Sequence, residues 1–198
     1  MQPKFIFDLS EVLIMGLVGI EKPLSHLLDM PENEILPGFA GELLQKICRG
    51  EISEDYYLQE IVAKQNWQIE IEQLKRIIRE NFHQEVEGTK EILSKLADKN
   101  EVILLSDHAR EWVATIKEIH SLFELFNTVF FSYELGGTKK EPQTFRKVLQ
   151  QMNYRAQECW LIDDSATNIK VAASVGINGI QFTNAKQLQD TLVHQLLI

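Results

Sequence analysis

The sequence predicts an α/β fold, in which an all-helical cap is inserted into a doubly wound parallel sheet. Short and almost continuously apolar segments alternate with segments whose apolar residues recur every three to four positions. That alternation is typical of parallel strands covered by helices on both faces. A long helical stretch without a convincing strand separates the first apolar segment from the second, which indicates an insertion.

The expected strands lack the polar alternation of half-exposed strands. They cover residues 4–7, 101–105, 128–131, 159–162 and 179–182. Amphipathic patterns predict helices over residues 87–98, 109–122, 143–152 and 166–175.

The insertion is expected to form a helical cap domain over residues 15–85, and the α/β core domain takes residues 1–14 and 86–198. Within the cap, helices are predicted over residues 40–48, 53–65 and 69–82. Ser53 is expected to cap the second of these helices, with Tyr56, Leu58, Ile61 and Val62 as its apolar positions.

Composition excludes several classes of function. The formal net charge of −9 argues against nucleic acid and anionic membranes as partners. No apolar run approaches the roughly 18 residues of a transmembrane helix, and the first residues do not resemble a signal peptide. Cys48 and Cys159 lie in helix-like and strand-like contexts, so we expect free thiols and a cytoplasmic location.

Polar residues follow four of the predicted strands. Asp8 ends the first strand, Ser106 ends the second, Lys139 lies in the loop after the third, and Asp163 and Asp164 end the fourth. Each alone fits a plain structural role as a turn residue, a helix cap or a solvated charge. Ligands of open α/β sheets, however, bind beyond the carboxyl ends of the strands, so these side chains are expected to converge.

Together these residues supply what phosphoryl transfer requires. Asp8 is a candidate nucleophile or metal ligand. Neighbouring carboxylates repel one another unless a cation joins them, and an all-oxygen ligand set favours Mg²⁺. Lys139 and Ser106 are then expected to bind the remaining phosphoryl oxygens, so the expected substrate is a small phosphorylated metabolite.

Four segments resemble the motifs of the haloacid dehalogenase-like hydrolase superfamily, in the same order along the chain. They are Phe5-Ile6-Phe7-Asp8-Leu9-Ser10-Glu11-Val12-Leu13, Leu104-Leu105-Ser106, residues 136–145 around Lys139, and Leu161-Ile162-Asp163-Asp164-Ser165-Ala166-Thr167-Asn168. The chain is similar to small members with a helical cap and a Rossmann-like core. The segment Arg49-Gly50-Glu51-Ile52-Ser53 also resembles the sugar-phosphatase group that includes a bacterial glucose-1-phosphatase.

This resemblance implies a mechanism. Asp8 would attack phosphorus and form an aspartyl-phosphate, while Mg²⁺ would be held by Asp8, the Ser10 carbonyl and Asp163, with Asp164 close by. Ser106 and Lys139 would bind substrate, and Lys139 would keep Asp8 ionised. Asp107 is placed with them as a substrate-binding residue, with an exposed aspartate at the start of a helix as the alternative.

Two positions depart from the family pattern, Ser10 and Asp107, and at the second of these the family more often carries asparagine. Ser10 stands where phosphatases of the family carry a second aspartate, which acts as acid and base, so hydrolysis is expected to be slow. Glu11 is an alternative acid, although its side chain is expected to point elsewhere. His108 is either a substrate contact or a solvated histidine at the start of a helix.

Three other functions stay open. The chain is alternatively a catalytically weakened protein that binds phosphate and metal. A phosphomutase needs the same absent acid. A haloacid dehalogenase uses the same aspartate nucleophile but needs a tyrosine at position 10 and an early arginine.

Overall fold

The computed structural model describes residues 2–195 and 197; residues 1, 196 and 198, which the sequence analysis assigned to the core, lie outside the described residues. Five strands form one parallel sheet in the order β3-β2-β1-β4-β5. The predicted strands are confirmed to within one residue at each end. They are β1 (Lys4–Phe7), β2 (Glu101–Ser106), β3 (Thr128–Phe131), β4 (Cys159–Asp163) and β5 (Asn178–Gln181).

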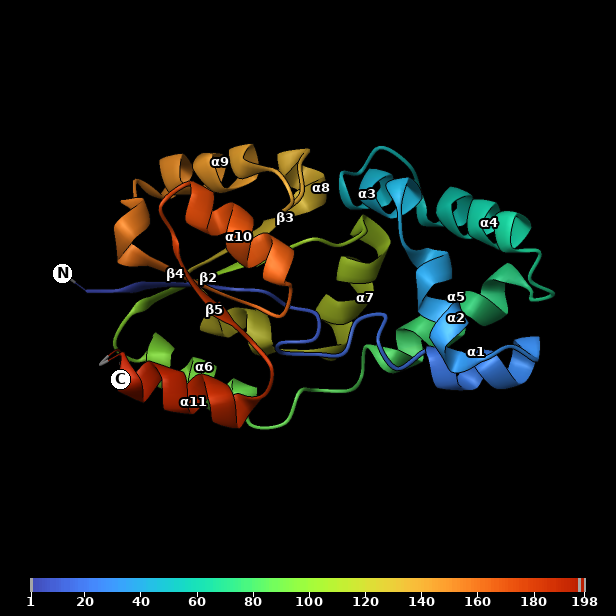
Figure 1. Cartoon of the computed structure of the whole chain (residues 1–198), viewed down its shortest axis with the longest axis horizontal. Coiled ribbons are helices and arrows are strands. Elements are labelled where there is room, and N and C mark those ends of the chain that lie inside the picture. The colour runs from blue at the N-terminus through green and yellow to red at the C-terminus, as the bar shows by residue number, and fades with distance from the viewer. Residues whose placement is uncertain (1, 196, 198) are drawn as a thin grey trace.

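Helices cover both faces of this sheet (Figure 1). One face carries α6 (Thr89–Ala97), α7 (Arg110–Ile119) and α11 (Ala185–His194), and the other carries α9 (Pro142–Met152) and α10 (Ala166–Ser174). Short elements complete the core: η1 (Leu122–Leu125), α8 (Ser132–Leu135) and η2 (Ala156–Glu158).

The side chains of β1 explain why the strands are apolar throughout. Phe5 and Phe7 pack into the cluster with α6 and α7, whereas Ile6 packs into the cluster with α9 and α10, and all three are fully buried. Because both faces are covered, both side-chain registers must be apolar. The doubly wound α/β prediction is therefore confirmed.

Five helices gather beyond the end of β1, at the opposite end of the molecule from the N-terminus (Figure 1). They are α1 (Glu21–Leu28), α2 (Glu32–Phe39), α3 (Glu42–Cys48), α4 (Glu54–Gln65) and α5 (Ile71–Asn81). The last three confirm the predicted helices, whereas α1 and α2 were not predicted. Pro37 lies inside α2 and Pro23 inside α1, and proline obscures a helical pattern in sequence. The domain boundaries at residues 15 and 85 stay a prediction.

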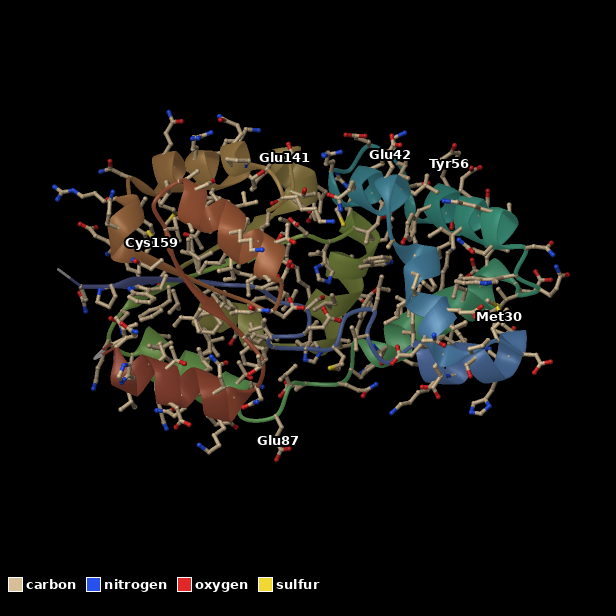
Figure 2. The ribbon with its side chains drawn as sticks, in the orientation of Figure 1. Met30, Glu42, Tyr56, Glu87, Glu141 and Cys159 are labelled. Atoms are coloured by element: carbon tan, nitrogen blue, oxygen red, sulfur yellow. The ribbon has the colours of Figure 1, made fainter. Side chains whose placement is uncertain are left out.

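The buried face of α4 differs from the predicted one. Tyr56 is 49% exposed and points outward (Figure 2), whereas the fully buried Tyr57 donates a hydrogen bond to the Phe39 carbonyl at 2.7 Å. The prediction that Tyr56 belongs to the apolar face is therefore wrong, because Tyr57 occupies the buried face of α4. Ser53 does cap this helix and accepts the Tyr56 N–H at 3.3 Å.

Both cysteines are free and buried, as expected. No helix in the described part of the chain has the length and apolar character needed to cross a membrane. The cytoplasmic location stays a prediction.

We expect Leu104→Ala to lower the free energy of unfolding by about 2–5 kcal/mol, because Leu104 is fully buried in the central part of the sheet and its loss leaves a cavity. Urea denaturation followed by circular dichroism measures the change. Leu27→Ala, at a position 49% exposed on α1, is the control and should cost no more than about 0.5 kcal/mol. A loss below about 1 kcal/mol for Leu104→Ala would contradict the packing described here.

Candidate active site

The site lies where the strand order reverses direction. From β1 the chain builds the sheet outward through β2 and β3, then crosses back to place β4 on the other side of β1. Phe7 pairs with Ile162, so Asp8 and Asp163 follow neighbouring strands at the same edge of the sheet. Open α/β sheets form ligand crevices at such points.

Lys139 joins these two carboxylates. Its Nζ lies 2.5 Å from Asp8 Oδ2 and 2.7 Å from Asp163 Oδ2. All three residues are buried, with 7% of Asp8, 1% of Lys139 and 0% of Asp163 exposed. The predicted convergence of residues 8, 139 and 163 is thus present in the structure.

The charges in this group are unbalanced. Burial lowers the pKa of Lys139, but the charges of Asp163, Asp8 and Asp107 raise it by more, so the ammonium group stays protonated. Burial raises the pKa of Asp8 well above its usual value, and Lys139 offsets only part of that shift. Lys139 does lower the pKa of Asp8, as expected, and a second cation beside these carboxylates would lower it further.

The donor set fits such a cation. Asp8, Asp163 and Asp164 each offer a carboxylate oxygen, and these oxygens lie within 4.8 Å of one another. Burial and the charge of Asp163 also raise the pKa of Asp164, so one positive ion would stabilise all three carboxylates. Hard, oxygen-only coordination suits Mg²⁺. The Ser10 carbonyl as a further ligand stays a prediction.

Neighbouring groups fix the orientation of the Asp163 carboxylate. Its Oδ1 accepts the Ser165 N–H at 2.9 Å, and Asn168 Nδ2 donates to both oxygens at 3.1 and 3.2 Å. Ser165 caps α10 by accepting the Asn168 N–H at 3.4 Å. The start of α10 therefore holds Asp163 in place.

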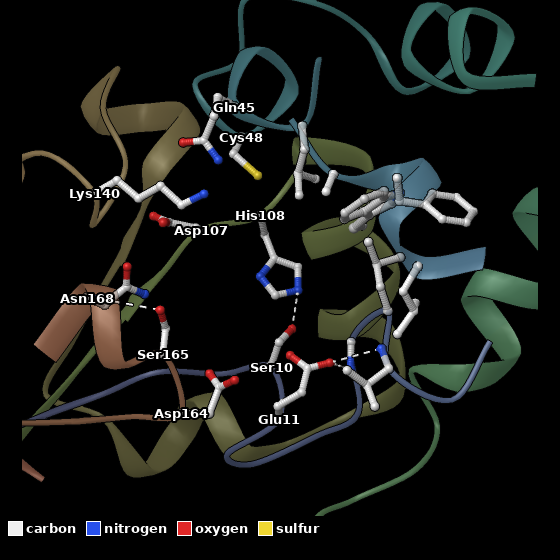
Figure 3. A pocket seen from close by; sticks show the side chains of 18 of the residues that line it. Ser10, Glu11, Gln45, Cys48, Asp107, His108, Lys140, Asp164, Ser165 and Asn168 are labelled. Atoms are coloured by element: carbon white, nitrogen blue, oxygen red, sulfur yellow. Dashed lines mark hydrogen bonds between the residues drawn. The ribbon is translucent and has the colours of Figure 1, made fainter. Parts of the chain in front are cut away.

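A buried histidine links the two serines of the site. His108 Nε2 lies 3.0 Å from Ser10 Oγ, and His108 Nδ1 lies 2.7 Å from Ser106 Oγ (Figure 3 draws the first contact). Burial, reinforced by the charge of Lys139, lowers the pKa of His108 to about 3, so the ring is neutral. One serine therefore donates to the ring and the other accepts from it. The alternative of a solvated histidine is wrong, because only 3% of His108 is exposed.

Asp107 supports the lysine loop. Both of its carboxylate oxygens accept the Lys139 backbone N–H, at 3.1 and 3.0 Å. Burial raises the pKa of Asp107 to about 6. The alternative of an exposed residue at the start of a helix is therefore wrong, because Asp107 is half-buried and α7 begins only at Arg110. Its substrate-binding role stays a prediction.

Glu11 faces the site, contrary to the expectation that it points elsewhere. Its backbone has a positive φ of 59°, and its Oε1 accepts the N–H groups of Gly16 at 3.0 Å and Val18 at 3.2 Å (Figure 3). A side chain at position 16 would force a shift, because its Cβ would lie 2.5 Å from Ser10 Oγ and 2.8 Å from Ser10 Cβ. Burial and the charge of Asp164 outweigh these hydrogen bonds and raise the pKa of Glu11 to about 7.

A pocket of about 340 Å³ opens next to this cluster (Figure 3). Ser10, Asp107 and Asp164 line the side of the pocket next to the acidic cluster. The pocket volume lies at the lower end of the range for small-molecule sites. Glu11, His108 and Asn168 also line it. The sequence offers Glu11 and His108 only as alternatives for the site, because neither the direction of a loop side chain nor its burial follows from local periodicity.

Comparison with known proteins places this geometry in context. A family model described as haloacid dehalogenase-like hydrolase matches residues 5–176. A solved enzyme of this family from Bacteroides thetaiotaomicron, in complex with magnesium and inorganic phosphate, superposes with a TM-score of 0.73 at 21% identity, over 93% of this chain and 96% of that one. A predicted hydrolase from Porphyromonas gingivalis gives a TM-score of 0.77 at 16% identity, over 99% and 98%.

Two curated relatives match shorter segments. Flavin mononucleotide hydrolase 1 of Arabidopsis thaliana is 28% identical over 123 residues, which are 62% of this chain and 50% of that protein. The sesquiterpene phosphatase astK of Aspergillus oryzae is 30% identical over 70 residues, 35% of this chain and 36% of that protein. The matched regions therefore span half or less of these relatives. None of the comparisons confirms the glucose-1-phosphatase subgroup.

Glu11→Gln should make stability less sensitive to pH. The pKa of Glu11 is about 7 when folded and lies near 4.3 in an unfolded chain, so its contribution to stability is full below about pH 4.3 and is lost as pH rises through 7. Glutamine keeps the acceptor oxygen for Gly16 and Val18 but does not ionise. We expect the variant to gain about 1–2 kcal/mol over wild type between pH 5 and pH 8, less than the full shift because the side chain is only half-buried.

Urea denaturation at both pH values, without divalent ions, measures this gain. Glu32→Gln on α2 removes one charge at an exposed position and serves as the matched control. An equal response of the two variants to pH would refute the assignment to Glu11.

Proposed function

Because the chain belongs to the haloacid dehalogenase-like hydrolases, we propose that it is a Mg²⁺-dependent phosphatase that releases phosphate from a small phosphorylated metabolite. The observation that carries the proposal is the buried group of Lys139 between Asp8 and Asp163 at the strand ends. Phosphatase activity of two relatives and bound magnesium and phosphate in one solved neighbour support it. We also propose that residues 15–85 act as a cap domain over this site.

In this proposal Asp8 is the nucleophile. A carboxylate oxygen of Asp8 forms a bond to phosphorus while the bond from phosphorus to the leaving oxygen breaks, which gives an aspartyl-phosphate and an alcohol. Water then attacks phosphorus while the bond from phosphorus to the Asp8 oxygen breaks, which releases inorganic phosphate and restores the Asp8 carboxylate. Bound Mg²⁺, held by Asp8, Asp163 and Asp164, would neutralise charge on the phosphoryl oxygens.

The remaining residues position the reactants. Lys139 orients Asp8 and offers positive charge to the phosphoryl group. Ser106 is fully buried and its hydroxyl is bonded to His108, so His108 sets the direction of that hydroxyl. Asn168 and Ser165 keep Asp163 directed toward the metal position.

The departing alcohol needs a proton, and no carboxylate stands at position 10 to give it. Ser10 instead lies in a hydrogen bond to His108, whose ring is neutral. Glu11, with a pKa of about 7, lines the same pocket. A serine hydroxyl is too weak an acid to protonate a leaving alcohol near neutral pH, so we expect turnover to be slow for esters of ordinary alcohols.

Asp8→Asn should lower Mg²⁺-dependent hydrolysis of para-nitrophenyl phosphate by at least about 10³-fold, because the amide is not a nucleophile. Release of para-nitrophenol measures the rate, and EDTA should abolish it in wild type. Asp190→Asn, on the exposed face of α11, is the matched control and should keep the wild-type rate. Equal rates for Asp8→Asn and wild type would instead favour a protein that binds phosphate and metal without catalysis.

Ser10→Asp should accelerate hydrolysis of an alkyl phosphate by about 10²–10⁴-fold, because it supplies an acid for a poor leaving group. A smaller gain is expected for para-nitrophenyl phosphate, whose leaving group needs less help. Phosphate release measures both rates, with Ser10→Asn as a control of similar size that lacks the acid. The absence of a gain, or equal gains for both variants, would show that Ser10 does not limit the rate.

A further inference from the structure

The pocket beside the acidic cluster has two walls of opposite chemical character (Figure 3). The wall formed by the core is polar, and the wall formed by residues 16–82 is apolar. From this division we propose that the substrate is a phosphate monoester whose alcohol portion is apolar rather than a sugar. This inference rests on the phosphatase function proposed above and specifies its substrate class.

Carbon atoms dominate the apolar wall. Its residues are Leu17, Val18, Leu36, Phe39, Ala40, Leu44 and Phe82, joined by Trp112 from α7. Phe39 and Phe82 are fixed by ring contacts, to Trp67 at 5.2 Å and to Trp112 at 6.1 Å between centroids. The Trp112 indole N–H already donates a hydrogen bond to Glu54 Oε1 at 2.8 Å. Only carbon atoms of the indole are therefore left to contact a ligand in the pocket.

Most backbone polar groups of the loop at residues 16–18 are hydrogen-bonded within the protein, including the Leu17 carbonyl, which accepts the Ile20 N–H at 3.3 Å. The N–H groups of Gly16 and Val18 are donated to Glu11, and the carbonyls of the same two residues accept from Asn81 Nδ2, both at 2.8 Å. The loop therefore presents the side chains of Leu17 and Val18. Val18 is 43% exposed in this structure, and an apolar ligand would cover it.

Only two polar side chains interrupt the apolar wall, Gln45 and Cys48. Gln45 Oε1 already accepts the Thr138 hydroxyl at 3.0 Å, which leaves its amide N–H₂. Cys48 is buried, and burial raises the pKa of its thiol, which is only a weak donor. A sugar brings several hydroxyl groups, and those without partners on this wall would lose affinity.

The polar wall of the pocket fits the phosphate group of such an ester. Ser10, Asp107, His108, Asp164 and Asn168 belong to or adjoin the proposed phosphate and metal site. Lys140 brings one positive charge to the lining, whereas Glu11, Asp107 and Asp164 bring three carboxyl groups. A second anionic group on the alcohol portion is therefore unfavourable. The volume of about 340 Å³ restricts the ester to a small one.

Straight-chain alkylphosphonates from methyl to hexyl test this inference, since their carbon–phosphorus bond resists hydrolysis. Calorimetry on the full chain with Mg²⁺ measures each dissociation constant. Burial of each added methylene should tighten binding about fourfold until the apolar wall is covered. The same titrations with glucose 6-phosphate and hexyl phosphate on Asp8→Asn should show hexyl phosphate binding at least about 100-fold more tightly.

Val18→Asn and Leu36→Asn should weaken hexylphosphonate binding about tenfold and affect methylphosphonate much less. Val193→Asn is the matched control for Val18, because Val193 is a 52% exposed valine on α11, away from the pocket. It should leave the whole series unchanged. Circular dichroism confirms that each variant is folded.

Two outcomes would overturn the substrate class. They are an affinity that does not depend on chain length, and tighter binding of glucose 6-phosphate than of hexyl phosphate. In either case, Asp8-dependent hydrolysis of para-nitrophenyl phosphate would leave the phosphatase function standing. A clear chain-length dependence in a protein that hydrolyses no ester would support the apolar site and refute catalysis instead.

Discussion

The ion contact of Lys139 with Asp8 and Asp163 is the interaction on which the site depends. Three charged groups are buried together, and each would be unfavourable there without the others. The contact exists because the parallel pairing of β1 with β4 brings two strand ends together, and the loop before α9 crosses above them. The apolar sheet therefore has a chemical role, since it sets the distance between the two carboxylates.

The local charge of the site contrasts with the charge of the whole chain. A protein with a net charge of −9 is proposed to bind an anionic phosphate ester. Lys139 supplies one buried positive charge, and the unbalanced carboxylates around it create a site for a divalent cation. Neutral groups do the remaining positioning: His108 between two serines, and Asn168 on Asp163.

The proposed division of labour between core and cap follows from their packing. Residues at the strand ends are held by the rigid sheet, which suits chemistry that needs fixed geometry. Several polar side chains of residues 15–85 are already bonded within the protein, such as Asn81 to the loop carbonyls and Glu54 to Arg79 and to Trp112 of α7. The cap surface that remains toward the pocket is apolar, and this surface is proposed to select the substrate.

The sequence by itself determined the order of the strands and helices of the core and the strand-end positions of Asp8, Ser106 and Asp163. A continuously apolar segment indicates a strand that is buried on both faces of the sheet. The residues that end such strands in a parallel sheet lie at the same edge of that sheet. Only the tertiary structure decided that His108 is buried between Ser10 and Ser106 and that Glu11 turns toward the pocket. It also decided that Tyr57, rather than Tyr56, lies on the buried face of α4. The reason is physical: the direction, partners and pKa of a side chain depend on groups distant in the chain, which no local pattern encodes.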